Sequence, residues 1–574
     1  MKNLFKYIGR DKKSAILGLA SKFTETIFEL FLPLVMANLI EKTISKVDFK
    51  LILIHGILML VIIIVNIVLA IFGQYFAAKA STSFGKSLRN ALYNHISALS
   101  YSGIDNIGAS SLITRLTNDT ATVQNVVFMT VRVGLRAPFV AIGAIIMVFI
   151  IDPVIAPVFV GIMALVVLSV ILLSNKSSKI YRFVRRKLDR IVSVTRENVT
   201  GVRVVRANSR RNAEIERFSE TVDEYKKSSL NAARFTSLLH PISVLVVQTG
   251  VLGILIVAGL AQGSSISTAT LTAFVTYMMQ ILFAIIVLTN LASIFIRASA
   301  SAQRINEVLE LPKAINIKNG IDTFNYDHEY AIEFDNVSFG YSAENVLNNI
   351  SFKIRKGETL GILGGTGSGK TSLVNLIPAF YYPSNGQVKI FDVDTRTANL
   401  TQLRNFVSIA PQKAIINSGS IRENVSFGRN LSDDSIITAL SIAKADFVDF
   451  SEDGLNKQID RDGHNISGGQ KQRLSIARAI AQIPKILILD DAGSALDYAT
   501  DRAVSTALSI NYPDLTKIIV SQRVFAVRQS DVIIMLDNGR IAGIGTHDDL
   551  IKMCPSYLEV YLTQVPETEV VYEK

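Results

Sequence analysis

The longest uncharged stretch of this chain constrains its fold most. Residues 235–296 contain no Asp, Glu, Lys or Arg, and the sequence QGSS at 262–265 interrupts them near the middle. A helix needs about 20 apolar residues to cross a bilayer, so this stretch is long enough for two spans. Residues 51–78 form a second uncharged run, and 49% of the chain is hydrophobic. The chain is therefore predicted to be a membrane protein.

Six segments of the first 310 residues meet this length criterion. They lie near residues 15–41, 51–78, 126–151, 153–175, 236–261 and 266–296. The first is the least apolar because it contains Lys22, Glu25 and Glu29, whose spacing places them on one helix face. An acid that faces a cavity at membrane depth could bind cationic compounds. The alternative, which we favour, is that Lys22 pairs with Glu25 or that these residues lie outside the apolar core.

Basic residues predict the orientation of these segments. They occur in the N-terminal segment and between the fourth and fifth spans, at Lys2, Lys6, Arg10, Lys12, Lys13, Lys176, Lys179, Arg182, Arg185, Arg186, Lys187, Arg190, Arg196, Arg203, Arg206, Arg210 and Arg211. Under the positive-inside rule both regions are cytoplasmic. Six spans then place the N-terminus and the C-terminal part in the cytoplasm of a multi-pass protein of the cell membrane. The net charge of +11 is explained by these loops and does not require nucleic acid as a partner.

Two sequence features concern processing and redox chemistry. No cleavable signal peptide is expected, because no compact apolar core with a small-residue cleavage site follows the basic N-terminus. Cys554 is the only cysteine, so no disulfide can form within the chain.

The connections on the cytoplasmic side are long. Residues 79–125 and 176–235 are charged, yet their periodicity predicts helices that continue out of the membrane. Their turning points, near residues 102–111 and 207–213, could each press a short helix onto a cytoplasmic domain. The alternative is that both segments are solvated linkers.

The pattern changes after residue 310. Residues 311–330 read as a polar linker, and residues 331–574 alternate strand-like and helix-like segments with frequent glycine. We therefore expect an all-α transmembrane domain of six helices at 1–310, a linker at 311–330 and an α/β domain at 331–574.

A phosphate-binding motif lies in the α/β domain. Residues 364–371 (GGTGSGKT) match G-x-x-x-x-G-K-[ST], after an apolar strand and before a helix pattern. Such a loop lets successive backbone N–H groups converge on phosphate oxygens. The expected ATP contacts are Gly364, Gly365, Thr366, Gly367, Ser368, Gly369, Lys370, Thr371 and Ser372. Lys370 would reach the β and γ phosphates, and the Thr371 hydroxyl would bind Mg²⁺. The domain is thus predicted to be a P-loop NTPase.

Two further motifs support this prediction. Residues 486–491 (ILILDD) form an apolar strand that ends at Asp490, the expected partner of Mg²⁺. The run NISGGQ at 465–470 resembles the signature motif of ABC transporters, usually LSGGQ. The resemblance implies that Ser467, Gly468, Gly469 and Gln470 contact ATP held by an opposing subunit. The alternative for Ser467 is a structural helix N-cap.

Other positions match the same family in order. Tyr341 matches the aromatic residue that stacks on adenine, Gln412 matches the residue that links Mg²⁺ to the transmembrane interface, and Asp497 ends the D-loop. The layout resembles that of an exporter-type half-transporter and is similar to bacterial multidrug exporters. It implies small amphipathic compounds as substrates.

Two positions depart from the family pattern. Asp491 stands where a hydrolysing member has glutamate, and Gln522 stands where it has histidine. The shorter carboxylate is withdrawn by about one bond, and a misplacement of ~1 Å can cost on the order of 100-fold in rate. Glutamine cannot carry charge as histidine can. With these two changes the chain resembles the degenerate subunit of heterodimeric exporters. Such a subunit pairs with a second, non-identical half-transporter. The alternative is a working homodimer that tolerates both.

The resulting expectation is ATP-driven export by a heterodimer in which this chain's own ATP site hydrolyses weakly. Its signature motif would complete the competent site on the partner. The alternatives are a homodimeric exporter of lipid or peptide, and a membrane-anchored ATP-binding regulator that transports nothing.

Overall fold

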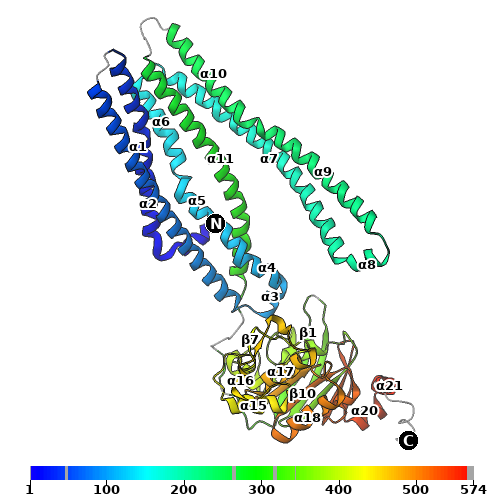
Figure 1. The fold of residues 1–574 in the computed structure, drawn as a ribbon. Helices are drawn as coiled ribbons and strands as arrows, with labels where there is room; N and C mark the ends of the chain where they lie inside the picture. Colours follow the sequence, from blue (N-terminus) through cyan, green and yellow to red (C-terminus); the bar gives the residue numbers. More distant parts are fainter. Residues whose placement is uncertain are drawn as a thin grey trace. The chain divides into compact units, whose positions relative to one another are not determined.

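The computed structural model describes residues 2–45, 49–260, 267–313, 320–322, 324–342 and 344–564. The chain divides into two compact units (Figure 1). Unit 1 comprises Met1–Ile96 and Ser110–Glu310, and unit 2 comprises Ser97–Ala109 and Leu311–Lys574. The turn expected at 262–265, part of the linker expected at 311–330 and the last ten residues of the expected α/β domain lie outside the described residues.

Apart from short turns, unit 1 is helical in the residues that the structure describes. Its elements are η1 (Lys2–Asp11), α1 (Lys12–Ser45), α2 (Phe49–Ile96), α4 (Ala109–Thr114), η2 (Arg115–Asp119), α5 (Thr120–Met129), η3 (Thr130–Gly134), α6 (Arg136–Ile151), α7 (Ala156–Thr200), α8 (Val202–Ala207), α9 (Arg211–Ser237), α10 (Leu239–Leu260) and α11 (Thr268–Glu310). Within the described ranges, five helical segments are long and apolar enough to cross a membrane, and Val244–Ile256 adds a shorter apolar helix within α10. The expected helical transmembrane domain is confirmed.

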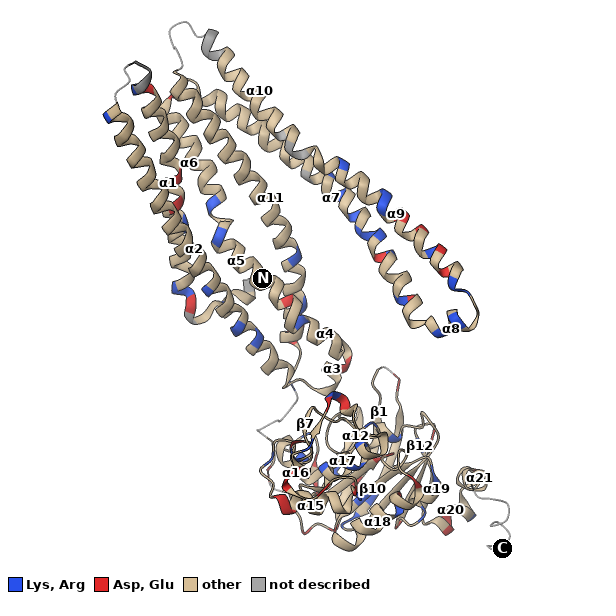
Figure 2. Cartoon of the chain, in the orientation of Figure 1, with Lys and Arg blue, Asp and Glu red and all other residues tan. Residues whose placement is uncertain are grey.

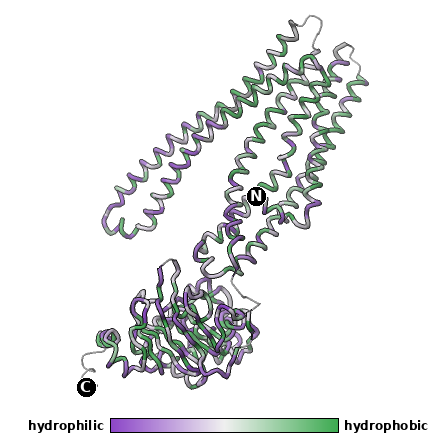
Figure 3. Tube along the Cα trace, turned by 180° about the vertical axis from the view of Figure 1, so that it is seen from behind, coloured by the Kyte–Doolittle hydropathy of each residue, from purple (hydrophilic) through white to green (hydrophobic). Residues whose placement is uncertain are grey.

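The spanning helices extend well beyond their apolar parts. Figure 3 shows that α7, and the arm formed by α9 and α10, change from apolar to hydrophilic along their length, and Figure 2 shows charged residues gathered on the hydrophilic ends. The helix α7 runs without interruption from Ala156 to Thr200, and α2 from Phe49 to Ile96. The long connections are therefore helical continuations of the spans, as the periodicity predicted.

The charged residues of α1 are paired inside unit 1. Lys22 Nζ lies 2.6 Å from Glu25 Oε2, and both residues are buried. Lys22 packs over Gly73 of α2, where a Cβ would lie 2.9 Å from the lysine Cε. This is the pairing favoured from the sequence. Glu29 instead pairs with Arg136 at the start of α6, with Nη2 lying 2.7 Å from Oε1, a partner that the sequence did not indicate.

Unit 2 is an α/β domain, as expected. Its strands are β1 (Tyr330–Phe339), β2 (Leu347–Arg355), β3 (Thr359–Leu363), β4 (Asn385–Ile390), β5 (Val393–Asp394), β6 (Val407–Ala410), β7 (Gly419–Ser420), β8 (Gln458–Ile459), β9 (Ile486–Asp490), β10 (Thr516–Ser521), β11 (Val532–Asp537) and β12 (Arg540–Gly545). Its helices are α3 (Tyr101–Ile107), α12 (Lys370–Leu376), α13 (Leu400–Phe406), α14 (Ile421–Ser426), α15 (Asp433–Ile442), α16 (Glu452–Leu455), η4 (Arg461–Gly463), α17 (Gly468–Ile480), α18 (Tyr498–Asn511), α19 (Val524–Val527), α20 (His547–Met553) and α21 (Pro555–Gln564).

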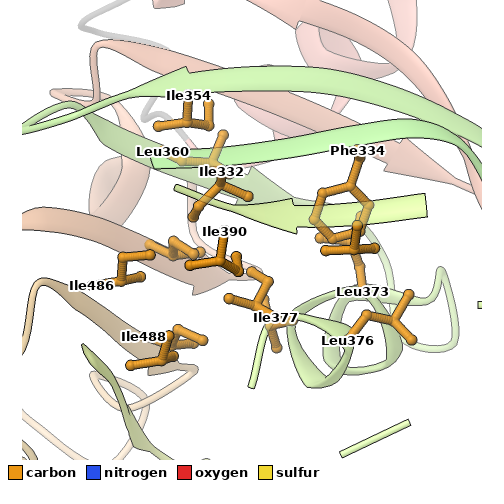
Figure 4. Close-up of a cluster of buried hydrophobic side chains, with 14 of the residues drawn as sticks. Ile332, Phe334, Ile354, Leu360, Leu373, Leu376, Ile377, Ile390, Ile486 and Ile488 are labelled. Carbon is orange, nitrogen blue, oxygen red and sulfur yellow. The ribbon is translucent and has the colours of Figure 1, made fainter. Parts of the chain in front are cut away.

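The strands of unit 2 form two main sheets. One is four-stranded and antiparallel with the order β2-β1-β4-β5, and the other is six-stranded with the order β12-β11-β3-β10-β9-β6. Apolar side chains from both sheets and from α12 share one core (Figure 4). The cluster includes Ile332 and Phe334 of β1, Ile486 and Ile488 of β9, and Leu373 of α12. This packing holds the helix that follows β3 against the sheets.

A short segment from the transmembrane half of the sequence belongs to unit 2. The helix α3 begins after the N-cap Ser100, and its Tyr101 ring stacks on Phe380 with 4.5 Å between centroids. Tyr381 donates a hydrogen bond from its hydroxyl to Asp105. A short helix therefore lies on the α/β domain at the first expected turning point. The second turn carries α8, which contacts α7 and α9 of its own hairpin.

Candidate nucleotide-binding site

The site lies at the carboxyl ends of neighbouring parallel strands. In the six-stranded sheet β3, β10, β9 and β6 run parallel, and their register aligns Leu363 with Ser521, Val520 with Asp490, and Leu489 with Ala410. The residues that follow these strands therefore gather at one edge of the sheet. Ligands of open α/β sheets bind at this edge.

The loop after β3 depends on glycine at particular positions. Gly367 and Gly369 have φ of 83° and 101°, a region that side chains with a Cβ avoid. A Cβ at Gly364 would lie 2.3 Å from the Leu536 carbonyl oxygen. At Gly365 and Gly367 a Cβ would meet nothing within 4 Å, so these two glycines border open space on the loop. Thr366 lies between them.

Lys370 closes the loop from the inside. Its Nζ donates to the carbonyl oxygens of Gly364 and Gly365 at 2.8 and 2.6 Å. Burial lowers the pKa of this ammonium, and the nearby charges of Asp491 and Asp490 oppose that shift. A buried cation that is held by carbonyl dipoles is suited to an anionic ligand.

Thr371 and Asp490 form the expected metal-binding pair. The Thr371 hydroxyl donates to Asp490 Oδ1 at 3.3 Å, which joins α12 to the end of β9. Burial raises the pKa of Asp490, and the neighbouring Asp491 adds to the rise, whereas the Thr371 hydrogen bond and Lys370 oppose it. A divalent cation would reverse this penalty because it stabilises the ionised carboxylate.

Asp491 occupies an unusual backbone conformation. Its φ is 48°, which is uncommon for a residue with a Cβ. Its N–H donates to the Val520 carbonyl at 3.0 Å, and its carboxylate accepts a hydrogen bond from Gln412 Nε2 at 3.1 Å. Gln412 follows β6, where Gln472 of α17 donates to the carbonyl of Pro411 at 3.0 Å. Gln412 and Asp491, which are both expected site residues, are therefore in direct contact.

Gln522 follows β10 directly. Its carbonyl accepts a hydrogen bond from Gln564 Nε2 at 2.8 Å, and the N–H of Val524 donates to Gln564 Oε1 at 2.8 Å. The side chain of Gln522 is exposed. Gln564, the last residue of α21, thus holds both sides of the segment that carries Gln522.

The signature segment forms a helix start. Ser467 is the N-cap of α17, and its hydroxyl accepts from the Gln470 N–H while Gln470 Oε1 accepts from the Ser467 N–H at 2.9 Å. Gly468 borders open space, whereas a Cβ at Gly469 would lie 3.2 Å from the Ala495 carbonyl. The structural N-cap role of Ser467 is therefore present. It does not exclude phosphate contact, because Ser467 and Gly468 are exposed.

Asp497 and Tyr341 complete the set of expected residues. Asp497 is the N-cap of α18, and hydrogen bonds from the backbone and hydroxyl of Thr500 lower its pKa. Tyr341 is half exposed, and its hydroxyl lies 3.1 Å from Ser372 Oγ in α12. Its ring meets Tyr381 edge-on at 5.1 Å. The Tyr341 ring thus lies next to the phosphate loop with half of its surface available for a base.

These residues fit a nucleoside triphosphate with a divalent cation. Ser368 Oγ is buried and has no hydrogen-bond partner among the described residues, and the Lys370 ammonium is hydrogen-bonded to loop carbonyls. Both groups would gain partners from phosphate oxygens. Thr371 and Asp490 offer the hard oxygen ligands that Mg²⁺ prefers.

Comparison with known proteins identifies the family. A model of the ABC transporter transmembrane region matches residues 15–285, and a model of the ABC transporter matches residues 347–494. An uncharacterized ABC transporter ATP-binding protein of Bacillus subtilis, YfiB, is 32% identical over 553 residues, covering 96% of each chain. The chain belongs to the ABC transporter family. The match to the ABC transporter model at residues 347–494 implies that the chain binds ATP.

Further comparisons support the assignment of this ABC transporter. An uncharacterized ABC transporter ATP-binding protein of Mycobacterium tuberculosis is also 32% identical, over 95% of this chain and 94% of its own. The structure of a bacterial Atm1-family ABC exporter with ATP bound aligns with a TM-score of 0.78 at 20% identity. It covers 97% of this chain and 98% of that one. This structural similarity shows that the chain has an exporter-type fold.

Sequence reasoning missed three residues at the site of this ABC transporter. Gln472, Gln564 and Asp501 belong to none of the recognised sequence motifs. Asp501 of α18 packs over Gly493, where a Cβ would lie 2.5 Å from its Oδ1. Burial raises its pKa, Arg523 opposes the shift and Asp491 adds to it. Gln472 stands between Lys471 and Arg473, so nothing in the sequence distinguishes it, although α17 buries its side chain.

Proposed function

We propose that this chain is one half of a heterodimeric ABC exporter whose own ATP site hydrolyses weakly. One observation carries the proposal: Asp491 and Gln522 stand in an otherwise complete site. The phosphate loop, Asp490 and the signature segment retain the groups that binding requires, whereas the two positions that act on the attacking water are altered.

The geometry around Asp491 supports weak hydrolysis. A general base must lie within hydrogen-bond reach of its proton. The shorter Asp491 side chain is already engaged by Gln412 Nε2 at 3.1 Å, so it would have to leave this partner to meet a water. Gln522 can donate a hydrogen bond to a phosphate but cannot supply a positive charge.

In this proposal the remaining site residues divide between two ATP sites. Tyr341, residues 364–372, Gln412 and Asp490 would hold ATP and Mg²⁺ on this chain. Residues 467–470 and Asp497 would face the ATP site of the non-identical partner. The proposed orientation places the N-terminus and unit 2 in the cytoplasm, and the proposed cargo is small amphipathic compounds, on the strength of family likeness.

ATPase measurement tests the proposal. The full chain, purified from membranes with whatever co-purifies, is compared with a preparation in which it has been separated from other subunits. We expect a second subunit of similar size in the first preparation and little ATPase activity in the second. High activity of the chain alone would refute the weak site and favour a homodimer. ATP-dependent uptake into inverted vesicles distinguishes an exporter from a membrane-anchored regulator.

A further inference from the structure

A cavity of about 290 Å³ lies within unit 1, between α1, the start of α6 and α11. Glu29, Arg136 and Gln280 form its polar wall, and Val140 and Phe283 belong to its apolar wall. Each of the three polar residues comes from a different apolar segment of the chain. Polar groups inside membrane-spanning segments are energetically costly, and by default they indicate functional sites.

The two charges in this cavity neutralise each other. Arg136 Nη2 lies 2.7 Å from both Glu29 carboxylate oxygens, and Arg136 Nε lies 3.3 Å from Oε2. The side chains remain 37% and 27% exposed, so both partners are accessible from the cavity. The pair therefore offers a donor and an acceptor next to each other with no net charge.

The backbone is interrupted on both sides of the pair. Pro33 in α1 has no N–H to offer the Glu29 carbonyl four residues earlier. Pro138 likewise has none for the Gly134 carbonyl, and residues Thr130–Gly134 form a π-helical turn, the kind of interruption that is frequent at functional sites. Each proline therefore leaves one backbone carbonyl, that of Glu29 or that of Gly134, without its usual helical N–H partner. The cavity is thus more than a packing defect between regular helices.

The amide of Gln280 adds an unfulfilled acceptor. Its Oε1 is buried and has no partner among the described residues. Leaving a buried acceptor unpaired is unfavourable, because its interaction with water is lost and nothing replaces it. A ligand N–H in the cavity could satisfy it after a small rotation of the side chain.

Charge balance selects the ligand class. A lone cation that took Glu29 would leave Arg136 without its partner, and a lone anion that took Arg136 would leave Glu29 alone. Leaving one charge of the pair without its partner inside an apolar segment of a membrane protein is unfavourable. In a molecule with an ammonium and an anionic group close together, the ammonium can take the place of Arg136 beside Glu29. Its anionic group can take the place of Glu29 beside Arg136, so neither charge is left unpaired. The apolar wall at Val140 and Phe283 suits an attached hydrocarbon chain.

We propose that this cavity binds zwitterionic amphipaths. Their ammonium group lies against Glu29 and Gln280, their anionic group against Arg136, and their chain along Phe283. This inference rests on the proposed export function and narrows its substrate class. It also replaces the simpler idea that Glu29 attracts cations, because Arg136 already neutralises Glu29.

Fluorescence of an introduced tryptophan can test this binding. The chain contains no tryptophan, so Phe283→Trp in the full chain, in lipid nanodiscs, is a single reporter at the cavity. It is titrated with N-dodecylglycine, dodecylamine, dodecyl sulfate and dodecanol, which share one chain and differ in charge. We expect saturable binding of N-dodecylglycine with at least about tenfold higher affinity than the other three. Phe72→Trp on α2, a helix whose apolar part is almost entirely exposed, is the matched control for partition into the bilayer.

Charge variants in the reporter background complete the test. Glu29→Gln is expected to abolish the preference for N-dodecylglycine and to favour dodecyl sulfate, and Arg136→Gln is expected to favour dodecylamine. The double variant Glu29→Arg with Arg136→Glu re-forms the pair and is expected to recover the zwitterion preference. Equal affinity for the four probes, or single variants that leave their ranking unchanged, would overturn the proposal.

Binding and transport are measured separately, so the two proposals can fail separately. Selective binding without ATP-dependent uptake would refute export and leave the zwitterion site standing. ATP-dependent export without selective binding in the Phe283→Trp reporter would leave the exporter and refute this substrate class.

Discussion

The side-chain amide of Gln412 donates a hydrogen bond to the carboxylate of Asp491 at 3.1 Å. The two residues follow β6 and β9, which are adjacent parallel strands. The Asp491 N–H also donates to the Val520 carbonyl at 3.0 Å, so the residue is held at its backbone as well as at its carboxylate. The position that we propose to be altered for catalysis is therefore held within the site and joined to the segment that follows β6.

Restoring the longer side chain should restore hydrolysis. Asp491→Glu moves the carboxylate outward by about one bond, and a placement error of ~1 Å costs on the order of 100-fold. Since Gln522 stays in place, we expect a partial gain of at least about tenfold in ATPase rate at this site. The measurement is the steady-state ATPase of the complex that co-purifies with the chain. Asp491→Asn is the matched control and should show no gain; a similar rise in both variants would contradict the argument.

The segment that carries Gln522 should depend on the last helix. Gln564 accepts from Val524 N–H and donates to the Gln522 carbonyl, both at 2.8 Å. Gln564→Leu removes both bonds, so hydrogen exchange of the Val524 amide should accelerate by about fivefold, which corresponds to roughly 1 kcal/mol. Gln564→Glu can still accept from Val524 but cannot donate, so it should keep Val524 protected while loosening Gln522. Equal exchange in all three proteins would show that α21 does not hold this segment.

The phosphate loop could be predicted because its signal is local. Glycines at fixed spacing after an apolar strand specify the turn and the following helix. Asp490 ends a second apolar strand, and the parallel sheet brings the ends of its strands to one edge. The pairing of Lys22 with Glu25 is local in the same way, since the two residues are three positions apart on one helix. By contrast, Glu29 meets Arg136 across 107 positions, and helix periodicity says nothing about which face of another helix it will meet.

Gln564 and Asp501 illustrate the same limit in unit 2. A glutamine at the end of an amphipathic helix has no distinguishing pattern, and its role arises only because α21 packs beside α19. The heterodimer hypothesis has another origin. It comes from two substitutions in a recognised motif, and a single chain cannot reveal its partner.

Removing the buried charge of Asp490 should stabilise the protein when no metal is bound. Burial raises the pKa of Asp490 in the folded state, so folding favours its protonated form. The resulting stability is fully present below the ordinary pKa of an aspartate and is lost as the pH rises through the folded pKa. At neutral pH Asp490→Asn should therefore raise the free energy of unfolding by about 1 kcal/mol.

The same variant should lose stabilisation by ligand. ATP with Mg²⁺ raises the unfolding temperature of a protein that binds it in the folded state, and Asp490→Asn removes a metal ligand in our proposal. Thermal unfolding with and without Mg²⁺ and ATP measures both effects. Asp497→Asn is the control, because hydrogen bonds lower the pKa of Asp497 and its substitution should bring no gain. If the metal-free Asp490→Asn protein were less stable than the wild type, the predicted gain in the free energy of unfolding would be wrong.

Docking of α3 onto the rest of unit 2 should depend on one hydroxyl. Tyr381 donates to Asp105 and also meets Tyr341 edge-on, so it links α3 to the aromatic residue beside the phosphate loop. Tyr381→Phe keeps the ring contacts and removes the hydrogen bond. We expect the amides of residues 104–107 to exchange about fivefold faster, since a bond worth about 1 kcal/mol is lost.

Tyr382→Phe provides the comparison for this last prediction. The Tyr382 hydroxyl is buried and has no hydrogen-bond partner among the described residues, so its removal should leave α3 unchanged and should not destabilise unit 2. The two variants delete the same atom at adjacent positions. Faster exchange in Tyr381→Phe alone would therefore assign the effect to the bond with Asp105. Equal exchange in both variants would mean that the stacking of Tyr101 on Phe380 suffices to hold α3.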